Sequence, residues 1–216
     1  RHPSSAQHLV RRLVGRHRIL WVNTIGMRSA KADRFTAGRA FDKFRQWACP
    51  LQQVAENFHV YSPAMLPAAG GRVGRLNSHL VAQRLRRLIG RLGMRRPILL
   101  TSVPTGADYV GRLGERAVVY YITDNYAAWP GACAGAVAAQ DEKLTRLADL
   151  LLPVGEALAH RPQARGLLQL LPHGVDLEHF AAVDGPLPEP PELASIARPR
   201  LCFFGLIYEK INLSLI

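Results

Sequence analysis

The sequence predicts an α/β fold, a Rossmann-like, doubly wound and mostly parallel sheet. Three observations predict it. Short apolar runs alternate with longer amphipathic segments along the whole chain. The run 117–122 (Ala-Val-Val-Tyr-Tyr-Ile) is apolar throughout, which is typical of a strand covered on both faces. Polar residues follow the ends of several runs, where sheets of this kind bind their ligands.

The first half of the chain contains sequence signals for both helices and strands. Ser4 and Gln7 have the spacing of a capping box, which predicts a helix over 4–16. The elements expected after it are a strand over 18–23, a helix with Phe41, Phe44 and Trp47 on its inner side, a strand over 58–61, a helix over 76–92 and a strand over 97–101. Because a complete fold of this type begins with a strand, we expect a first strand to be missing before the opening helix. The chain also lacks an initiator methionine, which suggests a trimmed or partial polypeptide.

The second half continues the alternation. We expect a short helix over 107–113, the strand 117–122, a helix over 134–148, a strand over 150–153, a small helix over 156–160 and a strand over 167–171. Five prolines in the sixteen residues 184–199 predict a linker rather than a regular helix. The domains expected are therefore 1–183, the linker 184–199, and in 200–216 the first strand and loop of a second domain.

Composition narrows the classes of function. A hydrophobic content of 48% is ample for a core, and no run of 18 apolar residues predicts a membrane span. The net charge of +12, mostly arginine, favours a polyanionic partner such as a nucleotide phosphate or an anionic membrane. Nucleic acid is less favoured, because no aromatic residues are interleaved with the arginines and no known motif is present. Three widely spaced cysteines indicate no disulfide framework and no metal site, and they fit a reducing cytosol.

Polar residues after the strands are the candidate ligand-binding groups. Asn23 and Thr24 follow one strand, and Thr123 and Asp124 follow the most apolar one. The Asp124 carboxylate could orient a sugar hydroxyl or accept its proton, although from spacing alone an aspartate here is more typical of an ordinary turn or helix cap. The same two interpretations, ligand contact or structural turn, apply to the segment that contains His173, Gly174 and Asp176.

Two further patterns involve cations. Gly205 ends the last apolar run and Lys210 follows it, an arrangement that can bind phosphate but is also that of an ordinary strand-ending turn. The segment 79–96 is an amphipathic helix rich in arginine. It could lie on an anionic membrane, or it could simply be a solvated helix face.

One motif carries a resemblance to a known family. The segment Pro172–Phe180 (Pro-His-Gly-Val-Asp-Leu-Glu-His-Phe) resembles the P-[NH]-G-V-D-x-x-x-F signature of glycosyltransferase family 4 and its relatives with the two-Rossmann GT-B fold. The segments 120–124, 142–143 and 148–153 resemble the progression that precedes that signature, and 200–216 resembles the opening of the donor domain. The most similar subset contains the teichuronic-acid-type transferases of bacterial envelope polysaccharide synthesis.

The resemblance implies transfer of a sugar from a nucleotide-sugar donor to a glycan or lipid-linked acceptor, usually with retention, and with no cofactor and no obligatory metal. It implies that Asp124 is catalytic and that Gly205 and Lys210 contact the donor phosphates. Asn23, Thr24, Thr123, His173, Gly174 and Asp176 are the expected substrate-binding residues. It also implies a cytoplasmic enzyme, peripheral on the inner face of the plasma membrane.

The chain departs from the family pattern in its last residues. Gly205 is followed by Leu206 where the family has arginine, and Lys210 is not at the usual spacing. The paired glutamates of the donor domain do not occur in residues 1–216, so we expect this chain to be inactive alone. Two alternatives remain open: a non-catalytic Rossmann-like domain that binds a polyanion or a lipid head group, and a related nucleotide-sugar epimerase.

Overall fold

The computed structural model describes residues 4–23, 51–63, 71–129, 133–181 and 189–200, together with Cys202, Asn212 and Ser214. The chain divides into two compact units, 1–173 and 174–216. The described part of the second unit contains two short helices, α6 (Leu177–Ala181) and α7 (Pro191–Ala194). The domain boundaries expected from the sequence stay a prediction. The helix expected around Phe41 and the strand expected from residue 200 lie outside the described residues.

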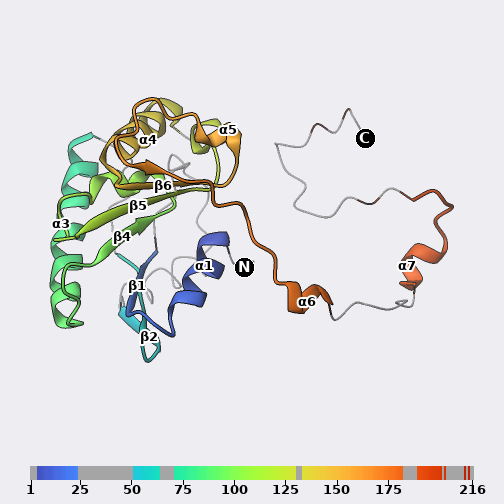
Figure 1. Ribbon diagram of the computed structural model, residues 1–216, viewed down its shortest axis with the longest axis horizontal. Coiled ribbons are helices and arrows are strands. Elements are labelled where there is room, and N and C mark those ends of the chain that lie inside the picture. Colours follow the sequence, from blue (N-terminus) through green and yellow to red (C-terminus); the bar gives the residue numbers. More distant parts are fainter. Residues whose placement is uncertain are drawn as a thin grey trace. The chain divides into compact units, whose positions relative to one another are not determined.

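A four-stranded sheet lies in the first unit (Figure 1). It contains β4 (Ile98–Thr101), β5 (Ala117–Ile122), β6 (Leu150–Pro153) and β7 (Leu167–Leu168), in the order β4-β5-β6-β7. All three strand pairs are parallel. With the helices that connect its strands, this sheet confirms the predicted α/β, Rossmann-like fold class.

A separate three-stranded sheet has the order β1-β3-β2. Its strands β1 (Ile19–Val22) and β3 (Phe58–Tyr61) are parallel, as the sequence predicts. The third strand, β2 (Leu51–Ala55), was not predicted, and it pairs antiparallel with β3. Its sequence, Leu-Gln-Gln-Val-Ala, contains no apolar run that would predict a strand. The four residues after Leu51 are exposed, so this strand needs no apolar run.

Helices connect the strands. α1 (Ser5–Leu13) has the predicted capping box: the Ser4 amide donates to Gln7 Oε1 at 2.7 Å, and the Gln7 amide donates to Ser4 Oγ at 3.3 Å. α4 (Ala134–Leu147) and α5 (Glu156–Ala159) agree with the predicted helices to within one residue at each end, whereas α3 (Gly71–Arg91) begins five residues before the predicted start at residue 76. Among the helices that the structure describes, none is long and apolar enough to cross a membrane.

Two predicted elements differ in their limits. The helix expected over 107–113 is a 3-10 helix, η1, that spans Pro104–Asp108. Pro104 fits the first turn of a helix, and positive φ angles of 76° and 71° at Gly111 and Gly114 end helical structure soon after. The strand expected over 167–171 is regular only over β7, although two backbone hydrogen bonds to β6 continue the pairing as far as Leu171.

The core consists of two hydrophobic clusters. One surrounds β5 and includes Tyr120 and Ile122 of that strand, Leu144 of α4 and Leu151 of β6, all completely buried. The other joins α3 to both sheets: Val81, Leu85 and Leu88 of that helix pack with residues that include Tyr61 of β3. These clusters fix the carboxyl ends of β4 and β5, where a cavity lies.

Candidate functional site

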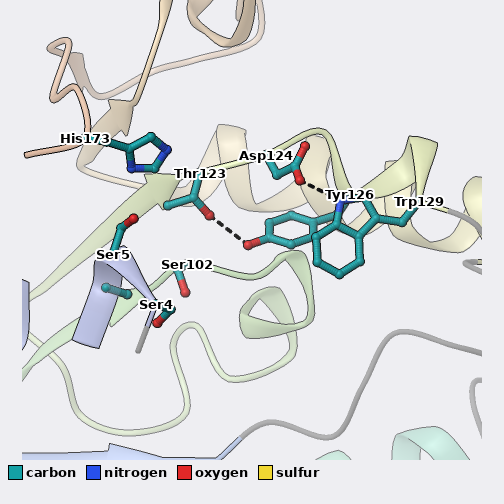
Figure 2. A pocket seen from close by; sticks show the side chains of 9 residues that line it. Ser4, Ser5, Ser102, Thr123, Asp124, Tyr126, Trp129 and His173 are labelled. Atoms are coloured by element: carbon teal, nitrogen blue, oxygen red, sulfur yellow. Dashed lines mark hydrogen bonds between the residues drawn. The ribbon is translucent and has the colours of Figure 1, made fainter. Parts of the chain in front are cut away.

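A cavity of about 310 Å³ lies where β4 and β5 end and α1 begins (Figure 2). Its walls come from four segments far apart in the sequence: the start of α1, the residue after β4, the loop that begins at the end of β5, and the chain beyond β7. The lining residues are Ser4, Ser5, Ala6, Ser102, Thr123, Asp124, Tyr126, Trp129 and His173. Nearly all of these side chains can form hydrogen bonds, and two are aromatic.

Asp124 forms hydrogen bonds with two groups of the loop that follows β5. Its Oδ2 accepts from the indole Nε1 of Trp129 at 2.7 Å, and its Oδ1 accepts from the backbone amide of Asn125 at 2.7 Å. Asp124 is therefore a positioned acceptor at the cavity wall, with little freedom to rotate.

Aromatic residues form one side of the cavity. The rings of Tyr126 and Trp129 lie 5.0 Å apart, centroid to centroid, at an angle of 50°. The Tyr126 hydroxyl and Thr123 Oγ1 are joined by a hydrogen bond of 2.8 Å (Figure 2). Burial raises the pKa of Tyr126 above its ordinary value, so its hydroxyl keeps its proton at neutral pH. The short helical turn η2 (Tyr126–Ala128) carries Tyr126 and leads directly to Trp129.

The start of α1 forms another wall. Ser4, Ser5 and Ala6 line the cavity, so the first backbone amides of the helix lie near it. A helix N-terminus carries a partial positive charge, and the first turn of α1 contains no acidic residue that would offset it. The cavity therefore combines a fixed carboxylate on one side with a weakly positive wall on the other.

The structure brings together three of the residues expected from the sequence: Thr123, Asp124 and His173 all line the cavity. Asn23 does not line it; the side-chain Nδ2 of Asn23 donates to Ser62 Oγ at 2.9 Å, just beyond the end of β1. Gly174 and Asp176 belong to the second unit, where Asp176 Oδ1 accepts from the His179 amide of α6 at 3.3 Å. Thr24, Gly205 and Lys210 lie outside the described residues. Substrate binding by any of these residues stays a prediction.

Other lining residues were not among the predicted site residues. Ser102 follows β4 directly, so its place after an apolar run was a usable signal. Tyr126 and Trp129 carry no comparable signal, because an aromatic residue in a loop is as often part of a core as of a binding site. Ser4 and Ser5 were recognisable only as a helix start. Their place beside β4 and β5 follows from packing that the sequence does not specify.

A smaller cavity of about 150 Å³ lies on the other side of the loop after β5. Asp124 and Tyr126 line both cavities, and Asp141 and Arg161, which form an ion pair, line the smaller one. Within the residues that the structure describes, no cluster of three or more histidine, cysteine or acidic side chains could hold a metal ion.

Comparisons with known proteins give limited information. No protein-family model and no curated protein matches the sequence. One solved structure with a similar shape is a sucrose-phosphate synthase from Thermosynechococcus elongatus, at 12% sequence identity and a TM-score of 0.43. The match covers 62% of this chain and 73% of that one. A similarity this low supports no functional argument, so the function rests on the geometry of the site and on the residues of the chain.

Proposed function

We propose that the chain is the acceptor-side domain of a glycosyltransferase that uses a nucleotide-sugar donor, and that the cavity at the ends of β4 and β5 binds the acceptor sugar. The observation that carries the proposal is the fixed Asp124 carboxylate, which accepts a hydrogen bond from Trp129 in a cavity rich in hydroxyl groups. The resemblance of Pro172–Phe180 to the family 4 signature supports the same conclusion.

The chemistry of a sugar matches the walls of this cavity. Sugars present hydroxyl groups around their rim, which need carboxylate, hydroxyl and amide partners, and their apolar C–H faces stack on aromatic rings. Asp124, Thr123 and Ser102 are partners of the first kind. The indole of Trp129 offers the second kind of contact beside the carboxylate.

In the proposed reaction, an acceptor hydroxyl forms the new bond to the anomeric carbon of the donor sugar while the bond to the nucleoside diphosphate breaks. The acceptor oxygen loses its proton and the diphosphate takes up the negative charge. Asp124 orients the attacking hydroxyl through a hydrogen bond, and its carboxylate is a base within reach of that proton. The start of α1 and His173 lie on the side of the cavity that suits the developing charge of the diphosphate.

Several finer parts of this function are also proposals. They are retention of configuration, an envelope polysaccharide or lipid-linked acceptor, and a location at the inner face of the membrane. The donor would be bound mainly by a second Rossmann-like domain, in which Gly205 and Lys210 are the proposed phosphate contacts. The experiment is therefore carried out on the full-length protein rather than on residues 1–216.

The test uses Asp124→Asn in the full-length protein, incubated with UDP-glucose, UDP-N-acetylglucosamine or GDP-mannose and with a lipid extract as acceptor. Transfer by the unchanged protein and a fall in kcat/KM of about a hundredfold or more in the variant are expected, because the amide cannot accept a proton. Glu142→Gln is the matched control, since Glu142 is exposed and pairs only with Arg146 among the described residues. Unchanged turnover in Asp124→Asn would remove the catalytic role.

A second candidate function is polyanion or lipid head group binding without catalysis. The observation that favours it is the exposed cationic surface of α3, which presents Arg84, Arg86, Arg87 and Arg91 to solvent. In the described part of the chain none of these arginines forms an ion pair. This function requires no reaction, so a full-length protein that binds anionic vesicles but transfers no sugar would favour it.

A further inference from the structure

The smaller cavity, of about 150 Å³, shares a wall with the larger one. The shared wall contains Asp124 and Tyr126, which line both cavities. Tyr126 is buried and Asp124 is partly exposed, so solvent reaches the wall at Asp124. Two cavities that meet at one accessible carboxylate are arranged as neighbouring subsites for a single ligand would be.

A partly buried ion pair lines the smaller cavity. The Arg161 guanidinium pairs with the Asp141 carboxylate, and these two side chains are 15% and 25% exposed. Tyr120 donates to the other oxygen of Asp141 at 2.5 Å, and Arg161 Nε donates to the Leu158 carbonyl at 3.0 Å. Both charged groups are therefore held in one orientation at the cavity wall. Such a pair contributes little net stability, because both charges lose contact with water.

The ion pair can still donate and accept further hydrogen bonds. Arg161 Nη2 forms no hydrogen bond within the part of the chain that the structure describes, so its N–H groups are available as donors. Each Asp141 oxygen accepts one hydrogen bond there and can accept a second. A hydroxyl group can accept from Arg161 and donate to Asp141 at the same time, because it has both functions. Adjacent hydroxyl groups of a sugar ring match this combination.

The charges around the smaller cavity favour a neutral occupant. Two carboxylates, Asp124 and Asp141, and the Arg161 guanidinium line it. A carboxylate or phosphate group in this space would be repelled by both acidic side chains, and the cation that could offset this is already paired. An ammonium group would be repelled by the guanidinium. A neutral, hydroxylated group meets no like charge.

The other walls of the smaller cavity are apolar. They include Pro104 of η1, Ala127 of η2 and Ala138 of α4, together with Tyr126. Because one water molecule takes up about 30 Å³, the cavity has room for a single ring-sized group. Small apolar side chains beside hydrogen-bonding groups suit a sugar ring, whose C–H faces are apolar and whose rim carries hydroxyl groups.

We propose that the smaller cavity is a second sugar subsite, and that the acceptor is a saccharide of at least two units. The unit that receives the new sugar lies at Asp124, and the neighbouring, neutral unit binds to Asp141 and Arg161. This inference rests on the proposed function, because there the larger cavity is the acceptor site. No bond is made or broken in the second subsite. Its role is to select acceptors that carry a neutral sugar next to the reacting one.

The first measurement is the binding of free saccharides to the full-length protein in the absence of a donor, followed by ligand-observed NMR titration. Maltose, cellobiose and α-1,2-mannobiose are compared with glucose and mannose. At least one disaccharide should bind about tenfold more tightly than its own monosaccharide, because the second unit adds hydrogen bonds at the ion pair. Equal binding of every disaccharide and its monosaccharide would overturn the proposal.

The preference for a neutral unit is tested with digalacturonate, in which both rings carry a carboxylate. It should bind less tightly than the best neutral disaccharide, because one of its carboxylates would face Asp124 and Asp141. Tighter binding of digalacturonate would overturn the assignment of a neutral sugar to the second subsite.

The second measurement places the gain in the smaller cavity. Ala138→Leu narrows this cavity from an exposed position on α4, whereas Ala139→Leu changes the next exposed position, which lines neither cavity. Leucine is a good helix former, so both variants should fold. The disaccharide advantage should fall from about tenfold to about twofold or less in Ala138→Leu, because the new side chain occupies the space of the second ring. It should persist in Ala139→Leu, and its persistence in Ala138→Leu would overturn the proposal.

The binding experiments and the transfer assay can fail separately, because binding of free saccharides requires no donor and no reaction. Loss of the disaccharide advantage, with transfer still dependent on Asp124, would remove only the second subsite. A disaccharide advantage that depends on Ala138, with unchanged turnover in Asp124→Asn, would remove only the catalytic role.

Discussion

The hydroxyl of Tyr120 donates a hydrogen bond of 2.5 Å to Asp141 Oδ1, and this bond connects β5 to α4. Tyr120 is completely buried, and the Arg161 guanidinium forms an ion pair with the second oxygen of the same carboxylate. The Asp141 carboxylate of α4 therefore joins β5 to the segment that contains Arg161. This group of contacts lies beside the loop that carries Asp124 and Tyr126. Burial first, and Asp141 second, raise the pKa of Tyr120, so its hydroxyl remains a donor over the whole physiological range.

Loss of this hydroxyl should destabilise the protein. Tyr120→Phe removes a buried donor to a charged acceptor, and we expect a loss of about 1.5–3 kcal/mol in the free energy of unfolding. Urea denaturation measures it. Tyr121→Phe is the control: Tyr121 is also buried on β5, but its hydroxyl forms no hydrogen bond within the described residues, so its loss should cost less. Equal losses in the two variants would show that the bond to Asp141 contributes nothing.

Alkaline pH should weaken the fold through buried tyrosines. Burial and the neighbouring Asp108 raise the pKa of Tyr109 from 10.0 to about 12. The folded state therefore holds the phenol proton more tightly than the unfolded chain does, so this contribution to stability is complete below pH 10 and is lost as pH rises toward 12. Urea midpoints measured at pH 8, 10 and 11.5 should fall in that order. Tyr109→Phe should make the decline less steep, and a parallel decline in the variant would contradict the assignment.

Two glycines should respond in opposite ways to substitution by alanine. A Cβ at Gly166 would lie 2.3 Å from the Ala148 carbonyl oxygen and 2.4 Å from that of Asp149. These are backbone atoms that cannot move aside cheaply, so Gly166→Ala should lower the melting temperature by several degrees. Gly90, in α3, has open space around it, and Gly90→Ala should raise stability by up to about 1 kcal/mol through helix propensity. Thermal unfolding of both variants tests the pair, and a stable Gly166→Ala would show that β7 begins differently.

If the proposed function holds, the bond between Trp129 and Asp124 allows positioning of the carboxylate to be separated from stacking of the ring in the full-length protein. Trp129→Phe keeps an aromatic ring but removes the Nε1 donor, so Asp124 loses the hydrogen bond from the indole. We expect kcat to fall about tenfold or more with little change in the acceptor KM. Trp129→Leu removes the ring as well and should also raise the acceptor KM. If Trp129→Phe raises only KM, the indole contacts the acceptor without orienting the carboxylate.

Anionic membranes should recognise the cationic surface of α3 through charge. Flotation with vesicles that contain phosphatidylglycerol should recover the protein at 50 mM salt and much less of it at 500 mM, because salt screens exposed charges. The triple variant Arg84→Gln, Arg87→Gln, Arg91→Gln should bind weakly at both concentrations. A matched variant with Arg11→Gln, Arg12→Gln and Arg16→Gln changes the charge equally on and after α1. Equal losses in both variants would mean that net charge, rather than this surface, determines binding.

Much of the fold could be predicted because its signals are local. β5 was recognisable since all six of its residues are apolar, and α1 since Ser4 and Gln7 have capping-box spacing. β2 was not, because an exposed antiparallel edge strand needs no apolar run. The separation into two sheets was also unpredictable, because strand pairing joins residues far apart in the chain and leaves no local pattern.

The candidate site also combines residues with a local sequence signal and residues whose role depends on packing between distant segments. Thr123, Asp124 and His173 could be found because each is a polar residue that follows an apolar run. Ser4 and Ser5 could not, because their role depends on how α1 packs beside β4 and β5. Trp129 could not either, because a single hydrogen bond to Asp124 determines its importance, and nothing in the local sequence indicates that bond.

The route that brings His173 to the cavity has a consequence for sequence change. Beyond β7, the amide of Gln169 donates to the Leu151 carbonyl at 3.0 Å and that of Leu171 donates to the Pro153 carbonyl at 2.9 Å. Main-chain hydrogen bonds guide this stretch and the side chains of Gln169 and Leu170 are exposed, so these two residues should tolerate many replacements. A one-residue insertion there would instead turn His173 to the opposite side, since side chains alternate along an extended chain. Homologous proteins should accordingly vary in the identity of these two residues and keep the number of residues in this stretch.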